Sequence, residues 1–289
     1  MRNNIWFVTG TTTGVGYVLV RRLLDEGYRV AATSRTREKL EELFGPESGQ
    51  FLPLSITDLS DEGQVLDARD AAVSKFGTVD VVVNNAGMAC CGAVEETSDR
   101  EARELFDVNF FGSLNVIRAF LPVLREQRGG CFLNINSDCG IAAHMDGGLY
   151  SASKHAQDAV SKVLSQELEP FGVHSVSVHL ANIRSHFNAH QHYTEKVIDD
   201  YAHIRALRAR RGNRSPGNPR KVVEMLLELS AMVHPPVDII LGGSGYRKIK
   251  KVLARDVKNL IDWEEVSLDV DTWDESDASD GLDGNAVVL

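Results

Sequence analysis

Residues 5–16 read IWFVTGTTTGVG. The first residues of this stretch form a short apolar run of the kind found in buried strands, and a helical pattern over 14–26 follows directly. Between them, Gly10, Gly14 and Gly16 allow a tight turn, at which backbone N–H groups at a helix N-terminus can approach a phosphate. The spacing G-x-x-x-G-x-G therefore predicts a strand, a phosphate-binding turn and a helix.

The same alternation continues outward from this stretch. Further apolar, strand-like runs lie at 29–33, 51–54, 79–83, 131–136, 173–180 and 237–241. Helical patterns lie at 37–44, 62–76, 100–127, 150–169 and 219–231. Alternating strands and helices imply right-handed crossovers and a parallel sheet covered on both faces. We therefore expect an α/β fold, a single-domain Rossmann-type doubly wound parallel sheet of about seven strands with helices on both faces.

The net charge of −10 is concentrated at the C-terminal end. Ten of the 41 acidic residues fall within 262–289, which has no Lys or Arg, so the remainder carries 31 acidic against 31 basic residues. A neutral body without a basic stripe argues against nucleic-acid binding. We expect residues 1–261 to form the dinucleotide-binding, catalytic domain and 262–289 to be an acidic, disordered tail.

Cysteine usage and hydropathy suggest a compartment. Cys90, Cys91, Cys131 and Cys139 contain no C-x-x-C pair, and this favours a reducing environment over a disulfide framework or a zinc site. No apolar run approaches the length of about 18–20 residues that a membrane span needs. We expect a cytoplasmic protein with no membrane association.

The end of the second predicted strand indicates which dinucleotide is bound. NAD-binding folds commonly place an acid there to hold the ribose 2′-hydroxyl. This strand ends instead in Ser34-Arg35. A guanidinium beside a hydroxyl suits a 2′-phosphate, so the sequence favours NADP(H). The alternative is that Arg35 is a solvated charge at the start of a helix.

Tyr150 and Lys154 open a predicted helix. Their i, i+4 spacing places them on one face, where the ammonium could lower the pKa of the phenol towards the range of proton transfer. The pair alone is a weak signal. Ser137 adds to it, because this residue ends a predicted parallel strand, at the edge where such sheets place ligands.

These motifs, in this order, resemble the short-chain dehydrogenase/reductase family over roughly residues 5–241. Residues 9–16 match its T-G-x-x-x-G-x-G cofactor loop, Asp58 its adenine-contacting acid, and 84–87 its N-N-A-G motif. The resemblance implies that NADP(H) is bound by Gly10, Thr12, Gly14, Val15, Gly16, Ser34, Arg35, Asp58, Asn85, Ala86, Gly87, Tyr150, Lys154 and Ser185.

The resemblance also implies a catalytic tetrad of Asn109, Ser137, Tyr150 and Lys154. Tyr150 would act as general acid in reduction and general base in oxidation. Lys154 would lower the pKa of Tyr150 and bind the nicotinamide ribose, and Ser137 would orient the carbonyl. Asn109 would bend its helix and hold a water in a proton relay.

Two departures from the family pattern stand near this site. The family's Pro-Gly after the sixth strand is replaced by Leu180-Ala181, with Ser185 in the place of a Thr near the carboxamide. Asp138 follows the catalytic Ser, where it could contact a substrate or cap the following turn.

The insert at 183–218 is polar and rich in His and Arg. By resemblance it is a flap over the substrate. Its histidines lack partners at ligand spacing, so we expect no metal site. The insert histidines are His186, His190, His192 and His203.

The sequence thus indicates an NADP(H)-dependent oxidoreductase that moves a hydride between the nicotinamide and a ketone/secondary alcohol pair. Its partner would be a small-molecule carbonyl or alcohol, and the resemblance implies a homodimer or homotetramer. Two alternatives stay open: a non-redox isomerase or cyclase, and a dinucleotide-sensing binding protein, both on the same scaffold.

Overall fold

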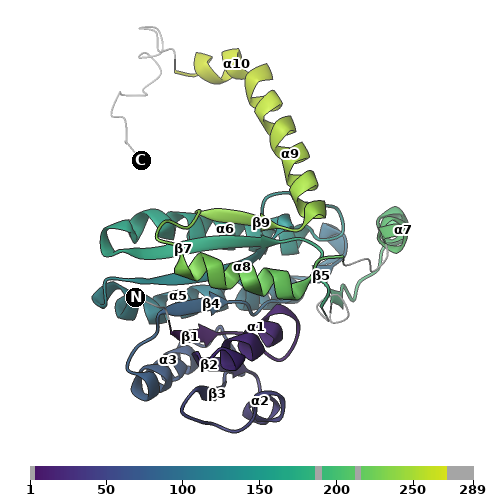
Figure 1. Cartoon of the computed structure of the whole chain (residues 1–289). Helices are drawn as coiled ribbons and strands as arrows, with labels where there is room; N and C mark the ends of the chain where they lie inside the picture. Colours follow the sequence, from purple (N-terminus) through teal and green to yellow (C-terminus); the bar gives the residue numbers. More distant parts are fainter. Residues whose placement is uncertain (1–3, 186–190, 212–215, 272–289) are drawn as a thin grey trace, which may run out of the picture. The chain divides into compact units, whose positions relative to one another are not determined.

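The computed structural model describes residues 4–185, 191–211 and 216–271. Its central feature is one seven-stranded sheet with the order β3-β2-β1-β4-β6-β7-β9, in which every pairing is parallel (Figure 1). The strands are β1 Ile5–Val8, β2 Arg29–Ser34, β3 Phe51–Ser55, β4 Val81–Asn84, β6 Gly130–Ser137, β7 Val173–Leu180 and β9 Asp238–Leu241. The predicted seven-stranded, doubly wound α/β sheet is confirmed.

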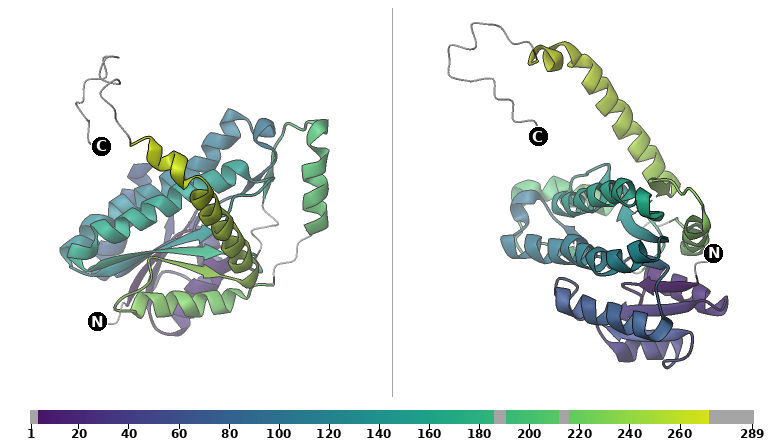
Figure 2. Two further views of the ribbon diagram at one scale, coloured as in Figure 1. Left: turned by 90° about the horizontal axis from the view of Figure 1, so that it is seen from above. Right: turned by 90° about the vertical axis from the view of Figure 1, so that its left-hand side faces the viewer.

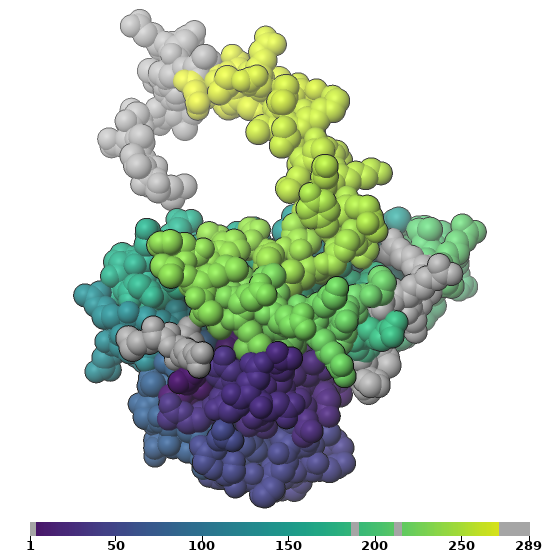
Figure 3. Space-filling model, in the orientation of Figure 1, coloured from purple at the N-terminus to yellow at the C-terminus, as the bar shows by residue number. Residues whose placement is uncertain are grey.

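Helices cover both faces of this sheet (Figure 2). Helices α1, α2 and α8 pack on one face, and α3, α5 and α6 on the other. Figure 3 shows α1 and α8, which contact each other, at the surface of the layer formed by α1, α2 and α8. The bounds are α1 Gly14–Asp25, α2 Arg37–Phe44, α3 Glu62–Phe76, α4 Asp99–Phe106, α5 Gly112–Glu126, α6 Gly148–Glu167 and α8 Pro219–Ala231.

Period-2 alternation in the strands builds the two cores. In β1, Trp6 and Val8 face the α1/α8 layer, whereas Ile5 and Phe7 face the α3/α5/α6 layer. All four side chains are buried, as expected for a parallel sheet covered on both faces.

The helical pattern predicted at 100–127 is present, with an irregular turn inside it. The structure divides it into α4 and α5, joined by a π-helical turn, η2, over Asp107–Phe111. A π turn carries one extra residue per hydrogen-bonded ring and bends the helix at the position of Asn109. Helical periodicity alone could not locate it, because the residues on both sides keep helical dihedrals.

The insert contains regular structure that the sequence did not predict. Strand β8, His192–Tyr193, pairs in parallel with the short strand β5, Cys90–Cys91. A 3-10 turn, η6 over Asp199–Tyr201, leads into helix α7, Ala202–Arg211. Figure 1 shows α7 at the same end of the sheet as β5.

The chain divides into two compact units, residues 1–248 and 249–289. The first contains the sheet, its helices and the insert. The second contains most of α9, Gly243–Asp262, and all of α10, Glu264–Asp269. Helix α10 lies within the stretch that was expected to be disordered, so this expectation is wrong for 264–269. Residues 272–289 lie outside the described part of the chain.

No helix within the described ranges is long and apolar enough to cross a membrane.

Candidate active site

The glycine loop packs against the segment that follows β4. Thr9 Oγ1 accepts the backbone N–H groups of Asn85 and Ala86, both at 3.0 Å. Asn85 Nδ2 donates back to the carbonyls of Thr9 and Gly10 at 2.9 and 2.8 Å. The T-G-x-x-x-G-x-G and N-N-A-G motifs therefore form one hydrogen-bonded unit at the carboxyl ends of β1 and β4.

The glycines of this loop meet two different requirements. A Cβ added to Gly10 would lie 2.7 Å from Ala86 Cα, and one added to Gly16 would lie 2.5 Å from the Gly10 carbonyl oxygen. These two positions require glycine because of internal packing. At Gly14, which has φ +61°, the nearest atom would be Ser185 Cβ at 3.3 Å. Gly14 is thus the glycine whose missing side chain leaves room beside Ser185.

This geometry fits a dinucleotide. Helix α1 begins at Gly14, its N-cap residue Thr13 makes no side-chain capping hydrogen bond, and its first turn has no acidic residue. Uncapped N–H groups at a helix N-terminus favour an anion such as a pyrophosphate. Thr12 and Val15, two of the predicted cofactor-binding residues, flank this turn.

At the end of β2, two neighbouring guanidinium groups differ in their partners. Arg37 is bound to Glu41 at 2.8 Å and to Glu47 at 3.0 Å. Arg35 is exposed, and only its carbonyl is engaged, by Ser55 Oγ at 2.9 Å, in the contacts the structure gives for this residue. Ser34 Oγ closes a local turn with Thr36. Of the two, Arg35 is therefore better placed to meet a 2′-phosphate.

Asp58 lies in the exposed turn after β3. Its Oδ1 accepts the backbone N–H and the hydroxyl of Ser60 at 2.8 and 2.7 Å. The carboxylate is thus held in a fixed position at the edge of the site.

Asn109 is buried in the π-helical turn and holds the segment after β4. Its Oδ1 accepts the Met88 N–H at 2.9 Å, and its Nδ2 donates to the Met88 carbonyl at 2.9 Å and to Ser153 Oγ at 3.0 Å. Asn109 thus lies in the π-helical turn, and its side chain links this turn to α6.

Lys154 lies in a buried pocket beneath this segment. Its Nζ donates to the Ile135 carbonyl at 3.1 Å and to Gln157 Oε1 at 2.8 Å. A Cβ on Gly87 would lie 3.7 Å from this Nζ. Burial lowers the pKa of Lys154 to about 8. Sequence reasoning did not identify Gln157, since no motif contains it.

Tyr150 and Ser137 are brought together by β6 and α6. Burial is the main cause of a raised Tyr150 pKa, and Cys139 raises it further, while a hydrogen bond with the Ser137 side chain opposes them. The expected lowering of the Tyr150 pKa by Lys154 is therefore not what this structure shows. The reason is that desolvation of a phenolate outweighs its polar contacts.

Ser137 Oγ is also held from the other side. It accepts the Cys139 N–H at 3.2 Å and lies 3.3 Å from Asp138 Oδ1. Asp138 Oδ2 pairs with Lys248 Nζ at 3.1 Å. The following turn is thus capped by Ser137, and not by Asp138, whose carboxylate is an ion-pair partner of α9.

The loop without the Pro-Gly pair keeps an ordered path. Ala181 N–H donates to the Leu241 carbonyl at 3.0 Å, and Arg184 N–H donates to the Gly217 carbonyl at 2.9 Å. The loop then brings Ser185 beside Gly14, as described above. Ser185 accordingly lies at the glycine loop.

Buried carboxylates hold the insert. Glu101 accepts His192 Nε2 at 2.9 Å, and Glu96 accepts Arg205 Nη1 at 2.6 Å. Arg208 Nε donates to Asp146 Oδ2 at 2.6 Å. His203 contacts the carbonyl of Asp200, while His186 and His190 lie outside the described residues. Among the residues that the structure describes, no three potential ligands are grouped to hold a metal ion.

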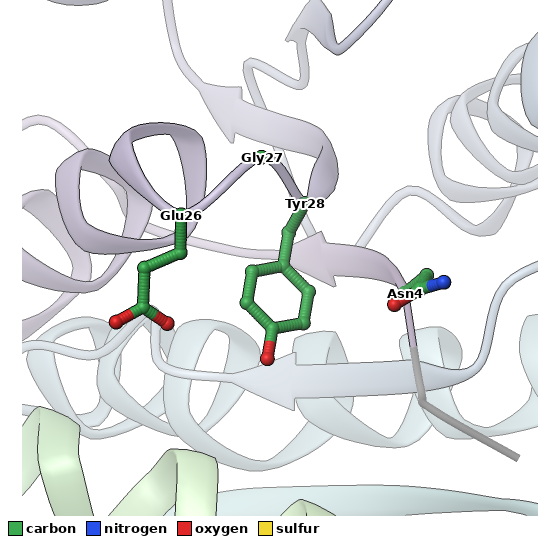
Figure 4. Close-up of a pocket in the computed structure, with 4 residues that line it drawn as sticks. All are labelled: Asn4, Glu26, Gly27 and Tyr28. Carbon is green, nitrogen blue, oxygen red and sulfur yellow. The ribbon is translucent and has the colours of Figure 1, made fainter.

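Two cavities differ in their relation to this site. One, of about 390 Å³, lies at the amino ends of β1 and β2 and is lined by Asn4, Glu26, Gly27 and Tyr28 (Figure 4). Doubly wound sheets place ligands at the opposite, carboxyl edge. The other, of about 260 Å³, lies between the insert and the segment before α6, and is lined by Gly92, Ala93, Val94, Glu95, His144, Met145, Asp146, Gly148, Tyr201 and Ile204.

Comparison with known proteins agrees with this geometry. The family model for short chain dehydrogenases matches residues 4–196. Oxidoreductase BOA17 from Botryotinia fuckeliana is 30% identical over 273 residues, 91% of this chain and 98% of that protein. A 3-ketodihydrosphingosine reductase from Bacteroides thetaiotaomicron is 30% identical over 241 residues, 82% of this chain and 87% of that protein.

Solved structures show the same relationship. A short-chain dehydrogenase from Streptomyces avermitilis superposes with a TM-score of 0.84 at 29% identity, covering 93% of this chain and all of that chain. One from Burkholderia cenocepacia in complex with NADP has a TM-score of 0.70 at 27% identity, covering 90% of this chain and 96% of that chain. The chain is therefore an oxidoreductase of the short-chain dehydrogenase/reductase family.

Proposed function

We propose that this protein is an NADP(H)-dependent carbonyl reductase or alcohol dehydrogenase acting on a ketone/secondary alcohol pair. The observation that carries the proposal is the pairing of a phenol, Tyr150, with the Ser137 hydroxyl at the carboxyl end of β6, one helical turn from the buried ammonium of Lys154. These groups suit a substrate that gains or loses one proton at oxygen.

Separate groups of residues would bind the cofactor and transfer the proton. NADP(H) would lie along the glycine loop and Ser185, with Arg35 at its 2′-phosphate, and would supply or accept the hydride. In reduction, Tyr150 donates its proton to the carbonyl oxygen while Ser137 hydrogen-bonds and orients this oxygen. Lys154 stabilises the phenolate that results.

Relatives support the substrate class and the cofactor. One relative is named as a reductase of a 3-keto compound, and one solved neighbour was crystallised with NADP. The cavity beside the insert combines apolar and polar lining, which favours a partly apolar substrate of medium size. We further propose a cytoplasmic location, which four unpaired thiols favour.

Tyr150→Phe tests the chemical role directly. With a carbonyl panel and NADPH, the variant is expected to lose at least about 100-fold in kcat, because general acid catalysis is removed. Its affinity for NADPH, followed by the fluorescence of the reduced nicotinamide, should fall by no more than about tenfold, since the phenol oxygen contributes at most one hydrogen bond to the cofactor.

Other outcomes would select the alternatives. Retained turnover in Tyr150→Phe would contradict the mechanism. Product formed without oxidation of NADPH would identify an isomerase or cyclase. Tight NADPH binding without turnover of any carbonyl compound would identify a dinucleotide-sensing protein.

A further inference from the structure

A chain of buried hydrogen bonds joins Lys154 to the main chain of the π-helical turn. Gln157 lies three residues after Lys154 on α6 and is 2% exposed. Its Oε1 accepts from Lys154 Nζ at 2.8 Å, and its Nε2 donates to Ser113 Oγ at 3.1 Å. Ser113 Oγ in turn donates to the Asn109 carbonyl at 3.1 Å. Two members of the predicted tetrad are therefore connected through two residues outside it.

We propose that Gln157 is a positioning residue, which fixes the Lys154 ammonium and couples it through Ser113 to the helix bend at Asn109. The kinetic consequence rests on the proposed function. The positioning itself concerns only residues of this chain.

The number of N–H donors on the Lys154 ammonium explains the importance of Gln157. An ammonium has three N–H groups, and the Ile135 carbonyl and Gln157 Oε1 engage two of them. The third N–H is then the one that can serve Tyr150 or a ribose hydroxyl. Without the Gln157 oxygen, a charged group in a buried pocket would lose one of its two partners, and this disfavours the charged form.

Gln157 also forms a hydrogen bond with Ser113 on α5. Its amide nitrogen donates a hydrogen bond to the Ser113 hydroxyl oxygen, and this hydroxyl donates its own proton to the Asn109 carbonyl. A carboxylic amide in a fixed orientation thus holds two elements, α5 and α6, at one separation. A leucine of similar volume would break both contacts while filling the same space.

The titration of Lys154 itself is the sharpest test. In protein labelled with ¹³C at the lysine ε carbon, the Lys154 resonance is assigned by its loss in Lys154→Met and followed against pH by NMR. A midpoint near 8 is expected in the parent protein. Gln157→Leu should move this midpoint down, because an acceptor for the ammonium is lost. Gln157→Glu should move it up by roughly one to three pH units, because an opposite charge is added.

The other titratable groups at this place are unchanged by these variants. Burial lowers the pKa of Lys154, and the charge of Cys139 raises it. Burial raises the pKa of Tyr150, and the charges of Cys139, Asp138 and Cys91 raise it further. Ser161→Ala is the matched control: Ser161 is buried on the same helix and bonds Asn134 and Ser175, away from Lys154. The Lys154 titration midpoint in Ser161→Ala should equal that of the parent protein.

Opposite shifts in the two Gln157 variants, with none in the control, support the proposal. Shifts in the same direction, or none, overturn it. Gln157→Glu preserves the shape of the side chain, so the test stands even where Gln157→Leu does not fold. With an active substrate, the upper limb of kcat/KM against pH should move with the midpoint. If no carbonyl compound is reduced, the proposed function fails, while the Lys154 titration still decides the role of Gln157.

Discussion

At the scale of single residues, neighbours in sequence have different roles because of the partners they find. Arg35 and Arg37 are two positions apart, yet Arg37 forms ion pairs with Glu41 and Glu47, whereas Arg35 is exposed. Ser137 and Asp138 are adjacent, yet Ser137 hydrogen-bonds with the Tyr150 side chain, whereas Asp138 pairs with Lys248. Residue type alone does not distinguish the members of either pair.

Arg35→Asp should change the cofactor preference. Loss of a charge-assisted contact with the 2′-phosphate, and repulsion by the new carboxylate, should weaken NADPH binding by about tenfold or more relative to NADH. Separate fluorescence titrations with NADPH and NADH measure this ratio. Arg37→Ala is the control and should leave the ratio unchanged, because its guanidinium is already engaged. An unchanged ratio in Arg35→Asp would remove this residue from the cofactor site.

At the scale of elements, buried acids hold the insert to the body. Glu101 on α4 accepts the N–H and hydroxyl of Ser98 at 2.8 and 2.6 Å, His192 Nε2 at 2.9 Å and the Glu195 N–H at 3.0 Å. Burial alone would raise its pKa, but these hydrogen bonds outweigh burial and lower the pKa to about 2. One carboxylate thus caps α4 and binds both β8, through His192, and the segment after it, through Glu195.

The same pKa predicts a pH dependence of stability. The pKa of Glu101 is lowered on folding, so its contribution is complete above pH 4.5 and is lost as the pH falls towards 2. Glu101→Gln should lower the free energy of unfolding by about 1–3 kcal/mol at pH 7, and the gap to the parent protein should narrow below pH 4.5. Urea unfolding at pH 7, 4 and 3 measures both.

A matched control is available on the same helix. Glu104 is 53% exposed and pairs only with Arg100 at the surface, in the contacts the structure gives for it. Glu104→Gln should change stability by less than about 1 kcal/mol at every pH. A gap for Glu101→Gln that stayed constant from pH 7 to pH 3 would show that its charge is not what holds the insert.

At the scale of the whole molecule, two exposed apolar side chains suggest a subunit interface. Phe111, at the end of the π-helical turn, is 47% exposed, and Val163 on α6 is 51% exposed. Both lie in the helical layer that contains α5 and α6, and we propose that this layer forms the interface of the expected homodimer or homotetramer. Association would remove these side chains from water.

Phe111→Asp combined with Val163→Asp should therefore yield a monomer. A charge in a desolvated apolar contact is strongly unfavourable. Sedimentation equilibrium of the parent and variant proteins measures the mass. Val233→Asp is the control, because Val233 is 76% exposed and follows α8 on the other face of the sheet. A parent protein that sediments as a monomer would refute the interface.

Local sequence patterns were enough to predict the sheet, the helices that cover it and the family. Strand-like runs and helical periods reflect local burial, and the motifs at residues 9–16, 84–87 and 150–154 depend on short spacings that one segment can carry. For this reason the seven strands and most helices were predicted to within a few residues. The predicted site residues could be named before any contact was known.

The contacts of these residues could not be predicted from the sequence, because they depend on how distant segments pack together. The pairing of β5 with β8 and the bridge from Lys154 through Gln157 to Ser113 join segments far apart in the chain. The π-helical turn at Asn109 changes a helix locally, over five residues. The direction of the Tyr150 pKa likewise depends on burial, which no spacing encodes. Such features arise from packing in three dimensions, where desolvation and the geometry of partners set the energies.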